Sequence, residues 1–221
     1  MREDDLTARA RIRDAAVRCF GEQGFGVSVR AIAAEAGVSP ALVIHHFGSK
    51  DSLREHCDEH VLAEVRHAKG DLVTSQRRGW LVEQLAEVEE YAPYAAYIVR
   101  SLQSGGELAR RFVDHMIADT EDYLAAGVSA GTVRPSRDPR ARARALILQN
   151  VGAMLVHLAL EEPTPGIDGF RVAMRELSEA MILPVLEIYA DGLLTDRRLL
   201  DEYLMYVTDP PGSARSDGEP S

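Results

Sequence analysis

The stretch GVSPALVIHHFGSKDSL, residues 37–53, contains a short helix that is apolar on nearly every side. Ser39 followed by Pro40 is typical of a helix start, and Gly48 is typical of a helix end. A helix in the core of a protein would be longer and would not carry two adjacent histidines. The stretch therefore contains apolar side chains that cannot all face the core and that need another partner.

The residues before this stretch have the pattern of two further helices. Gly24 ends the first helix, Ser28 caps the second, and Gly37 permits a left-handed turn before the third. Three helices in fewer than fifty residues, with glycine in the tight turn, predict a helix-turn-helix unit. The first helix carries its buried stripe at Ile12, Ala15, Ala16, Cys19 and Phe20.

The third helix separates into a core side and an outer side. Val43 and Phe47 lie four residues apart and face the first two helices, whereas Ala41, Leu42, Ile44 and His45 point away from them. An exposed apolar cluster needs a partner, and in the DNA major groove such side chains meet thymine methyl groups. We therefore interpret residues 39–47 as a recognition helix.

Polar groups around this helix fit contact with a nucleic acid. The helix starts at Ser28 and Ser39 offer free backbone N–H groups to phosphate, Lys50 supplies a point charge, and Arg30 is a candidate for a bidentate guanine contact. Two alternatives stay open: the three helices could bind a protein instead, and His45 or His46 could be structural, with the ring of His46 covering the edge of the core.

Residues 7–53 resemble the DNA-binding domain of TetR-type transcriptional regulators. The resemblance implies an all-helical dimer whose C-terminal domain binds a small effector and releases DNA. One position departs from the family pattern: Ile44 replaces the usual aromatic residue, whose hydroxyl reaches a phosphate. The matching segments are Ala15-Ala16, Phe20, Gly24-Phe25, Ser28-Val29-Arg30, Ile32-Ala33, Ala36-Gly37-Val38-Ser39, His46-Phe47, Ser49-Lys50-Asp51 and Leu53. The implied DNA contacts are Ser28, Arg30, Ser39, Pro40, Ala41, Leu42, Ile44, His45, His46 and Lys50.

Charge and composition favour a soluble cytoplasmic protein. The chain has 221 residues and a net charge of −10, yet residues 1–54 hold eight basic and seven acidic residues, so the acidic excess lies outside the front segment. Two cysteines fit no disulfide framework, and the N-terminus lacks an apolar signal core. The most apolar stretch, 145–160, is shorter than the roughly 20 residues that a membrane-spanning helix needs.

Helical spacing continues through the chain and predicts an all-α protein of two domains. Residues 1–54 form the helix-turn-helix domain, and residues 55–208 form a helical domain for effector binding and dimerisation. Residues 209–221 lack apolar side chains to bury and are expected to be disordered. The long helices are predicted at 51–71, 80–103, 107–126, 139–161, 170–193 and 196–206, with breaks at glycine or proline.

Aromatic and polar residues on the long helices are candidates for an apolar effector pocket. The alternative for each residue is ordinary packing in the helical bundle. The candidates are Trp80, Tyr91, Tyr94, Tyr97, Phe112, His115, Met116, Tyr123, Asn150, Met154 and His157.

Dimerisation is predicted for the last two long helices. The stretch 145–160 is apolar nearly all round, so it needs cover on both sides. Two such helices from each subunit would form a four-helix bundle, and Pro184 should kink the second helix. A purely intramolecular core is the alternative. The candidate dimer residues are Gly152, Ala153, Met174, Leu177, Met181, Val185 and Ile188.

Other chemistries have weaker support. His56, His60 and His67 lie along one side of a helix at a spacing that could bind a metal, so a metal-responsive regulator is the alternative hypothesis. No phosphate-binding loop, nucleophile elbow or catalytic carboxylate–histidine pair is evident, so we expect neither an enzyme nor a cofactor. The sequence thus predicts a repressor that a small apolar effector releases from a palindromic operator, by shifting the helix at 51–71.

Overall fold

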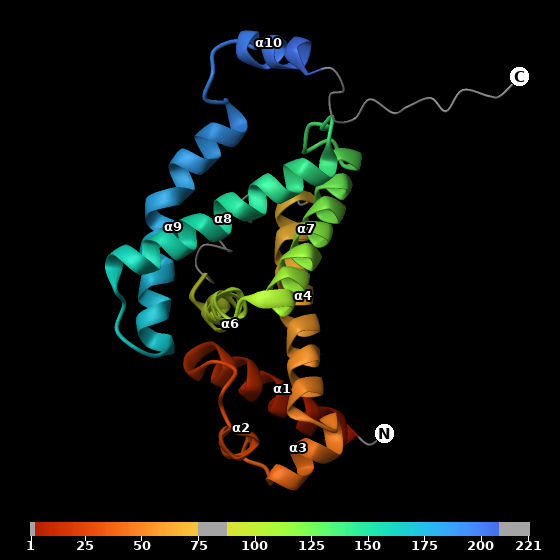
Figure 1. The fold of residues 1–221 in the computed structure, drawn as a ribbon, viewed down its shortest axis with the longest axis vertical. Coiled ribbons are helices and arrows are strands. Elements are labelled where there is room, and N and C mark those ends of the chain that lie inside the picture. Colours follow the sequence, from red (N-terminus) through yellow and green to blue (C-terminus); the bar gives the residue numbers. More distant parts are fainter. Residues whose placement is uncertain (1–2, 75–87, 208–221) are drawn as a thin grey trace, which may run out of the picture.

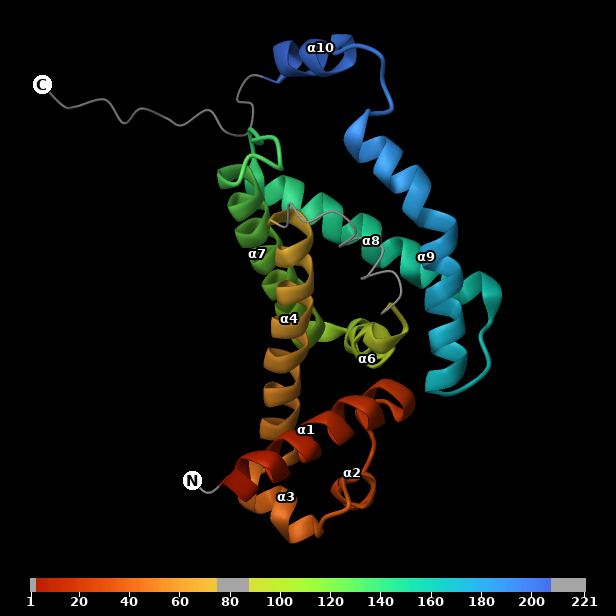
Figure 2. The same ribbon diagram turned by 180° about the vertical axis from the view of Figure 1, so that it is seen from behind.

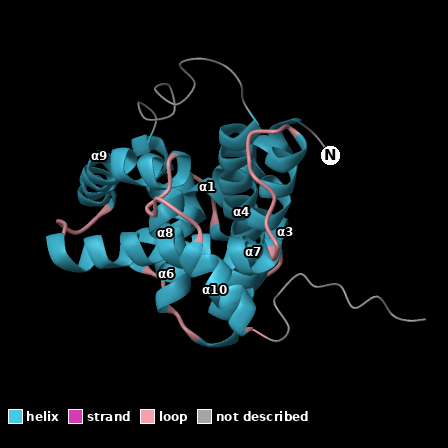
Figure 3. Ribbon diagram, turned by 90° about the horizontal axis from the view of Figure 1, so that it is seen from above, coloured by secondary structure: helices cyan, strands magenta, loops and turns pink. Residues whose placement is uncertain are grey.

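The structure, a computed structural model, describes residues 3–74 and 88–207, and within these ranges every regular element is a helix (Figures 1 and 3). The all-α prediction is confirmed. The predicted disordered tail and the candidate Trp80 lie outside the described residues. The elements are α1 (Glu3–Gln23), α2 (Val29–Ala36), α3 (Pro40–Phe47), α4 (Lys50–Thr74), the 3-10 helix η1 (Val88–Tyr91), α6 (Ala92–Gln103), α7 (Gly106–Ser129), α8 (Pro139–Glu161), α9 (Ile167–Ala190) and α10 (Arg198–Tyr206).

Side-chain caps define the turns of the N-terminal unit as the sequence predicts. The Ser28 hydroxyl accepts the Ala31 N–H at 3.2 Å, and the Ser39 hydroxyl accepts the Leu42 N–H at the same distance. Gly37 adopts φ 64°, a conformation that favours glycine because it has no Cβ. These local features place α2 and α3 as a helix-turn-helix pair against α1.

Helix α4 runs from the N-terminal unit to α7 in the body of the molecule (Figures 1 and 2). Its first half packs on α1 and α3, where Leu53, Cys57 and Val61 are buried, and its second half packs along α7. Helix α6 lies across the bundle beside α4 and makes its most extensive contact with α1. The N-terminal unit is therefore held by two helices, α4 and α6.

The predicted long helix at 80–103 differs from the structure. Residues 88–91 form a 3-10 turn, and the α-helix begins only at Ala92, with Pro93 in its first turn. Proline fits a first turn because its missing N–H has no intrahelical partner there. Tyr91 therefore precedes the helix that carries Tyr94 and Tyr97, and the prediction of one continuous helix was wrong for this part.

Helices α8, α9 and α10 form the far end of the molecule and bury little within their own chain. Only Ala143 and Met154 of α8, and Gly169 and Ala173 of α9, are buried. Helix α9 continues through Pro184 without a break. By length and composition alone, α8 could cross a membrane, because it has 23 residues and contains an 18-residue window with a mean hydropathy of 1.4. The apolar stretch 145–160, considered by itself in the sequence, is too short to do so.

Candidate functional site

Helix α3 has the two sides that its sequence predicts. Val43 and Phe47 are buried, whereas the Ile44 side chain is 44 % exposed and Ala41 and His45 are exposed. Leu42 differs from the prediction, because it is half-buried and packs against the core shared by the first helices. The outer surface of α3 therefore presents a smaller apolar patch, next to Ser39 and Pro40, than the sequence indicates.

The two histidines of α3 have different environments. The His45 side chain is exposed, and its ring centroid lies 5.4 Å from that of His46. His46 is half-buried beside Phe47, and its Nε2 is shielded from solvent without a hydrogen-bond partner among the described residues. His45 is thus free to face a ligand, whereas His46 lies at the edge of the core.

Three helices of the N-terminal unit, α2, α3 and α4, each start with a serine cap. Besides Ser28 and Ser39, the Ser49 hydroxyl accepts the Ser52 N–H at 3.0 Å and caps α4. Helix starts carry partial positive charge and free N–H groups, which favour phosphate. Sequence reasoning did not select Ser49, although a serine three residues before Ser52 at a helix start was a usable signal. Arg30, in the first turn of α2, is exposed, and Lys50, the first residue of α4, is half-buried.

Behind the helix-turn-helix unit, Tyr97 of α6 occupies the centre of a contact between helices. Its fully buried ring packs against Phe20, Phe25 and Phe112, with centroids 5.5 to 6.4 Å apart. Its hydroxyl donates to Asp58 of α4 at 2.6 Å, and burial raises the pKa of both groups. Tyr97, a candidate for an effector pocket, thus has both its ring and its hydroxyl engaged in the core.

Arg100 attaches α6 to the end of α1. Its guanidinium donates to the Gly21 and Glu22 carbonyls, both at 3.1 Å, and these are among the last carbonyls of α1. A Cβ on Gly21 would lie 3.1 Å from the Ala96 Cβ, so the two helices approach as closely as glycine permits. We call the contact formed by Gly21, Asp58, Tyr97 and Arg100 the α1–α6 joint.

The three candidate metal ligands of α4 have separate partners. His56 Nδ1 lies 2.9 Å from the Ser52 carbonyl, and His60 lies between Asp14 and Glu64 at 3.7 and 3.6 Å. His67 pairs with Asp71 at 3.6 Å. Among the described residues no group of three or more histidine, cysteine or acidic side chains could hold a metal ion. The structure therefore does not support the metal-responsive alternative.

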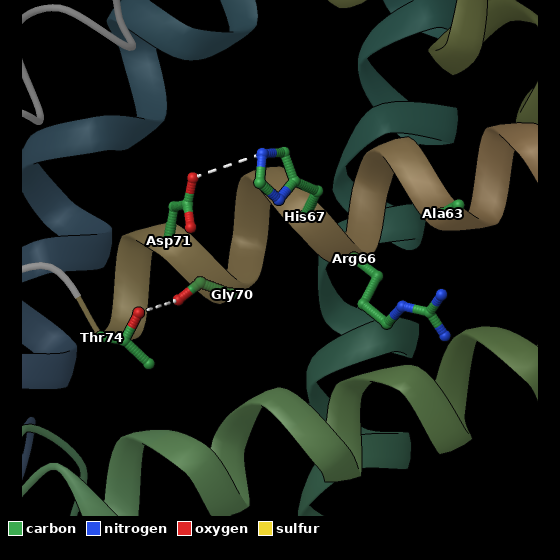
Figure 4. A pocket seen from close by; sticks show the side chains of 6 residues that line it. All are labelled: Ala63, Arg66, His67, Gly70, Asp71 and Thr74. Carbon is green, nitrogen blue, oxygen red and sulfur yellow. Dashed lines mark hydrogen bonds and ion pairs between the residues drawn. The ribbon is translucent and has the colours of Figure 1, made fainter.

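A hollow of about 440 Å³ opens along the second half of α4 (Figure 4). Its lining is more polar than the predicted effector pocket, because Arg66 pairs with Asp119 of α7 at 3.0 Å and His67 pairs with Asp71. These residues have the sequence pattern of a solvated helix face, so the sequence did not indicate a pocket here, and His67 was a candidate only for metal binding. The lining residues are Ala63, Arg66, His67, Gly70, Asp71 and Thr74.

The other effector candidates are dispersed over four elements. Phe112, Met116 and Met154 are buried, Tyr91, Tyr94, Tyr123 and His157 are half-buried, and His115 and Asn150 are exposed. The Asn150 amide donates to the Leu146 carbonyl, and His157 Nε2 lies 2.9 Å from the Ala173 carbonyl. These two polar side chains thus find partners within their own chain. Burial raises the pKa of Tyr94 and of Tyr123.

The candidate dimer residues lie on the outer part of α8 and α9. Met181 and Ile188 are exposed, Val185, Gly152 and Ala153 are half-buried, and Met174 and Leu177 pack partly against their own core. Leu148, Val156 and Leu160 of α8 are also exposed. Together they form a broad apolar surface without cover from the described part of the chain.

Comparison with known proteins finds regulators of one family at both ends of the chain. Residues 12–57 match the model of the tetR family of bacterial regulatory proteins, and residues 89–195 match a tetracyclin repressor-like C-terminal domain. The chain is 52% identical over 205 residues to the HTH-type transcriptional regulatory protein RaaS of Mycobacterium tuberculosis, covering 92% of this chain and 95% of the relative.

Two further matches are more distant. The transcriptional regulator BetI of Brucella anthropi is 46% identical over 65 residues, which is 29% of this chain and 30% of that protein. The structure of FadR from Bacillus subtilis in complex with stearoyl-CoA superposes with a TM-score of 0.54 at 20% identity, covering 84% of this chain and 99% of that one. At this identity the structural likeness concerns the fold.

Proposed function

Since the chain belongs to the TetR family of bacterial transcriptional regulators, we propose that it is a homodimeric repressor released from a near-palindromic operator by a small apolar effector. The observation that carries this proposal is the outer surface of α3. Ile44, Ala41 and His45 are exposed beside the capped starts of α2, α3 and α4. A small apolar patch beside phosphate-binding groups fits a major groove better than it fits water.

In the proposed complex each side chain has a distinct role. Arg30 reads a guanine, and Ile44 contacts a thymine methyl in place of the phosphate contact made by the usual aromatic residue. The capped starts at Ser28, Ser39 and Ser49 hold phosphates, with Lys50 adding charge. The remaining proposed contacts are Pro40, Ala41, Leu42, His45 and His46.

The proposed domains are 1–54 for DNA and 55–208 for the effector and the dimer. A helix-turn-helix regulator reads two half-sites about 34–36 Å apart, so it needs two copies held at a fixed spacing. The apolar surface of α8 and α9, with Met181 and Ile188 exposed, supports a four-helix bundle between subunits. The C-terminal end would therefore set the distance between the two recognition helices.

We propose that the α1–α6 joint transmits the signal together with α4. An effector between α4, α6 and α7 acts only if it fits the non-binding form better than the binding form. A shift of α6 would move Arg100 and the end of α1, which Arg100 contacts through two carbonyls. Because α1 carries α2 and α3, the spacing of the recognition helices would change.

The effector region is proposed to lie near the hollow on α4. Tyr123 of α7 is next to Gly70, which lines the hollow. Tyr91 and Tyr94 are half-buried with ring centroids 6.3 Å apart, which offers stacking surface for an apolar ligand. FadR, whose fold this chain shares, is described in complex with stearoyl-CoA, a ligand with a long apolar chain.

The test is binding of the purified protein to DNA upstream of its own gene. Fluorescence anisotropy at two salt concentrations, beside random DNA of equal length, should show a preference of about 10³-fold or more. The same assay then screens apolar compounds, and a true effector should lower operator affinity without changing random binding. Weak and equal binding to both DNAs, at low salt and after refolding to remove any bound ligand, would contradict the proposal.

A further inference from the structure

The last part of the described chain exposes most of its apolar surface. Of the 19 large hydrophobic side chains that are exposed in the described residues, 12 lie between Met181 and Tyr206. We call residues 181–206 the C-terminal arm. It comprises the end of α9, the loop 191–197 and α10, and none of its residues is buried. Its most exposed large apolar residues are Leu193, Met205 and Tyr206, with exposed fractions of 81%, 80% and 87%.

Helix α10 cannot be stable by itself in water. It has nine residues, whereas isolated helices shorter than about 12–15 residues are marginal even with favourable sequences. It has no extended packing against any described helix of its own chain, and Figures 1 and 2 show it apart from the bundle, beyond the end of α9. The described part of the chain therefore supplies little packing that would stabilise it.

One face of α10 has the form of a packing surface. Leu199, Tyr203 and Tyr206 follow at spacings of four and three residues, so they share one side of the helix. Their exposed fractions of 63%, 60% and 87% are far above those of packed side chains. Asp201 lies on the opposite side of the helix, whereas Glu202 borders the apolar side. An amphipathic helix with an uncovered apolar side is typical of a helix that packs onto another protein surface.

The end of α9 offers a matching surface. Met181, Val185 and Ile188 form the side that the proposed four-helix bundle uses, but Leu183 and Leu186 lie on a different side and are 64% and 40% exposed. A helix that is apolar all round is covered on all sides. The dimer bundle alone would leave this second side of α9 in water.

Helix α10 lies outside the matched family domain. The C-terminal family model ends at residue 195, three residues before α10 begins. Exposed apolar side chains follow the arm from the proposed dimer side of α9 to α10, and no buried residue interrupts them. In the proposed dimer a second copy covers the first part of this run, and the same copy is therefore the occupant that we infer for the rest.

We propose that the two protomers exchange their C-terminal arms, so that the apolar side of α10 packs on Leu183 and Leu186 of the other copy. This inference rests on the proposed dimer and adds to it a second contact, outside the four-helix bundle. The exchange would cover both the apolar side of α10 and the side of α9 that carries Leu183 and Leu186. It would also stabilise the dimer, in which the spacing of the subunits determines operator binding.

Cross-linking in the full chain tests the exchange. One tagged copy carries Tyr203→Cys and a differently tagged copy carries Leu186→Cys, and the two are co-expressed and treated with a flexible bismaleimide. A link between the two tags can form only between chains. The parent chain provides the background, since Cys19 and Cys57 are buried and burial raises the pKa of both thiols. Asp201→Cys, on the opposite side of α10, is the matched control.

We expect the Tyr203 pair to link at least fivefold more than the Asp201 pair. If the singly substituted chains do not link, or if Tyr203→Cys and Leu186→Cys link only within one doubly substituted chain, the exchange is wrong. As a second measurement, the dimer formed by a chain that ends at residue 195 should have a dissociation constant at least tenfold higher than that of a chain that ends at residue 207. Equal dissociation constants for the two chains would also overturn the exchange.

Sedimentation of the full chain separates this inference from the proposed function. A monomer at micromolar concentration would contradict the dimeric repressor itself. A stable dimer without links between chains would contradict only the exchange and would leave the four-helix bundle in place.

Discussion

The N-terminal unit of this molecule buries its apolar side chains within one chain, whereas the C-terminal helices leave most of theirs exposed. In α1, α2 and α3 the apolar stripes converge on one core, and Ile12, Phe20 and Ile32 are fully buried within a single chain. In α8, α9 and α10 the stripes are as apolar, but only four residues are buried and α10 has none. The core of the first unit is complete in one protomer, whereas we propose that another copy completes the second.

This difference matches the demands of the two tasks. The proposed DNA-reading surface requires Ile44, His45 and Arg30 at fixed positions, which a closed core with caps at Ser28 and Ser39 provides. In the proposed dimer the C-terminal end instead sets the distance between two such surfaces, which requires a contact between copies. On this proposal, the apolar residues left uncovered in the protomer serve assembly.

The strongest test of the comparison is Phe20→Ala. Phe20 is fully buried between Phe25 and Tyr97, so its removal should lower the free energy of unfolding by about 3–5 kcal/mol. Urea unfolding followed by circular dichroism measures the loss. Leu108→Ala on α7, at a side chain 50% exposed, is the matched control and should change stability by less than about 0.5 kcal/mol. Equal effects would show that the N-terminal core is not closed within one chain.

Arg30→Ala tests whether DNA reading resides in the N-terminal unit alone. Loss of a bidentate guanine contact should cost about 1–3 kcal/mol on the operator and relax preference at one base pair. Lys50→Ala should weaken operator and random DNA alike and reduce the salt dependence. Anisotropy titrations on both DNAs measure these losses. An equal loss on operator and random DNA for Arg30→Ala would remove its base-reading role.

Arg100→Leu tests the connection between the two regions. The change removes two hydrogen bonds to the carbonyls of Gly21 and Glu22 but keeps an apolar stem, so the expected loss of stability is about 1 kcal/mol. If the α1–α6 joint transmits the signal, operator affinity should respond less to an effector that still binds. Isothermal titration of the effector and anisotropy with DNA separate the two readouts. Arg110→Leu, on an exposed ion pair within α7, is the control. An unchanged response would assign transmission to α4 alone.

Much of the fold could be predicted from the sequence because local chemistry determines it. Ser28, Gly37 and Ser39 each act within three or four residues, and the structure confirms the turn that they predict. The bounds of α8 also agree, since Pro139 starts the helix. The start of α6 was missed because periodicity continues through the 3-10 turn at 88–91, and only Pro93 marked the change.

The site was less accessible to sequence reasoning because it depends on contacts across the chain. Tyr97 and Phe112 have the composition of a pocket wall, yet their rings meet in a core formed by α1, α6 and α7. Arg100 and Gly21 are 79 residues apart and carry no motif, so the joint could not be predicted. The hollow on α4 is lined by residues whose pattern is that of a solvated helix face.

A smaller effect, the response to acid, follows from His60 at the boundary between the two regions. Burial and the nearby Arg13 lower the pKa of His60, while Glu64 and Asp14 oppose the shift, and Tyr94 packs on the ring. The unfolded chain, whose histidine has a pKa near 6.5, then binds a proton more readily than the folded one. The stabilisation from the neutral ring is therefore complete above that pH and is lost as the pH falls through the lower folded pKa.

Urea unfolding at a series of pH values from 7.5 downward measures this contribution. One proton can change the free energy of unfolding by at most about 1.4 kcal/mol per pH unit, and the partly buried ring of His60 should give a fraction of that. His60→Asn should flatten the dependence below pH 6.5, whereas His67→Asn, at a side chain that is 78% exposed on the same helix, should leave it unchanged. If His60→Asn steepened the dependence, the ion pairs with Asp14 and Glu64 would outweigh burial, and acid would tighten α1 against α4 instead of loosening it.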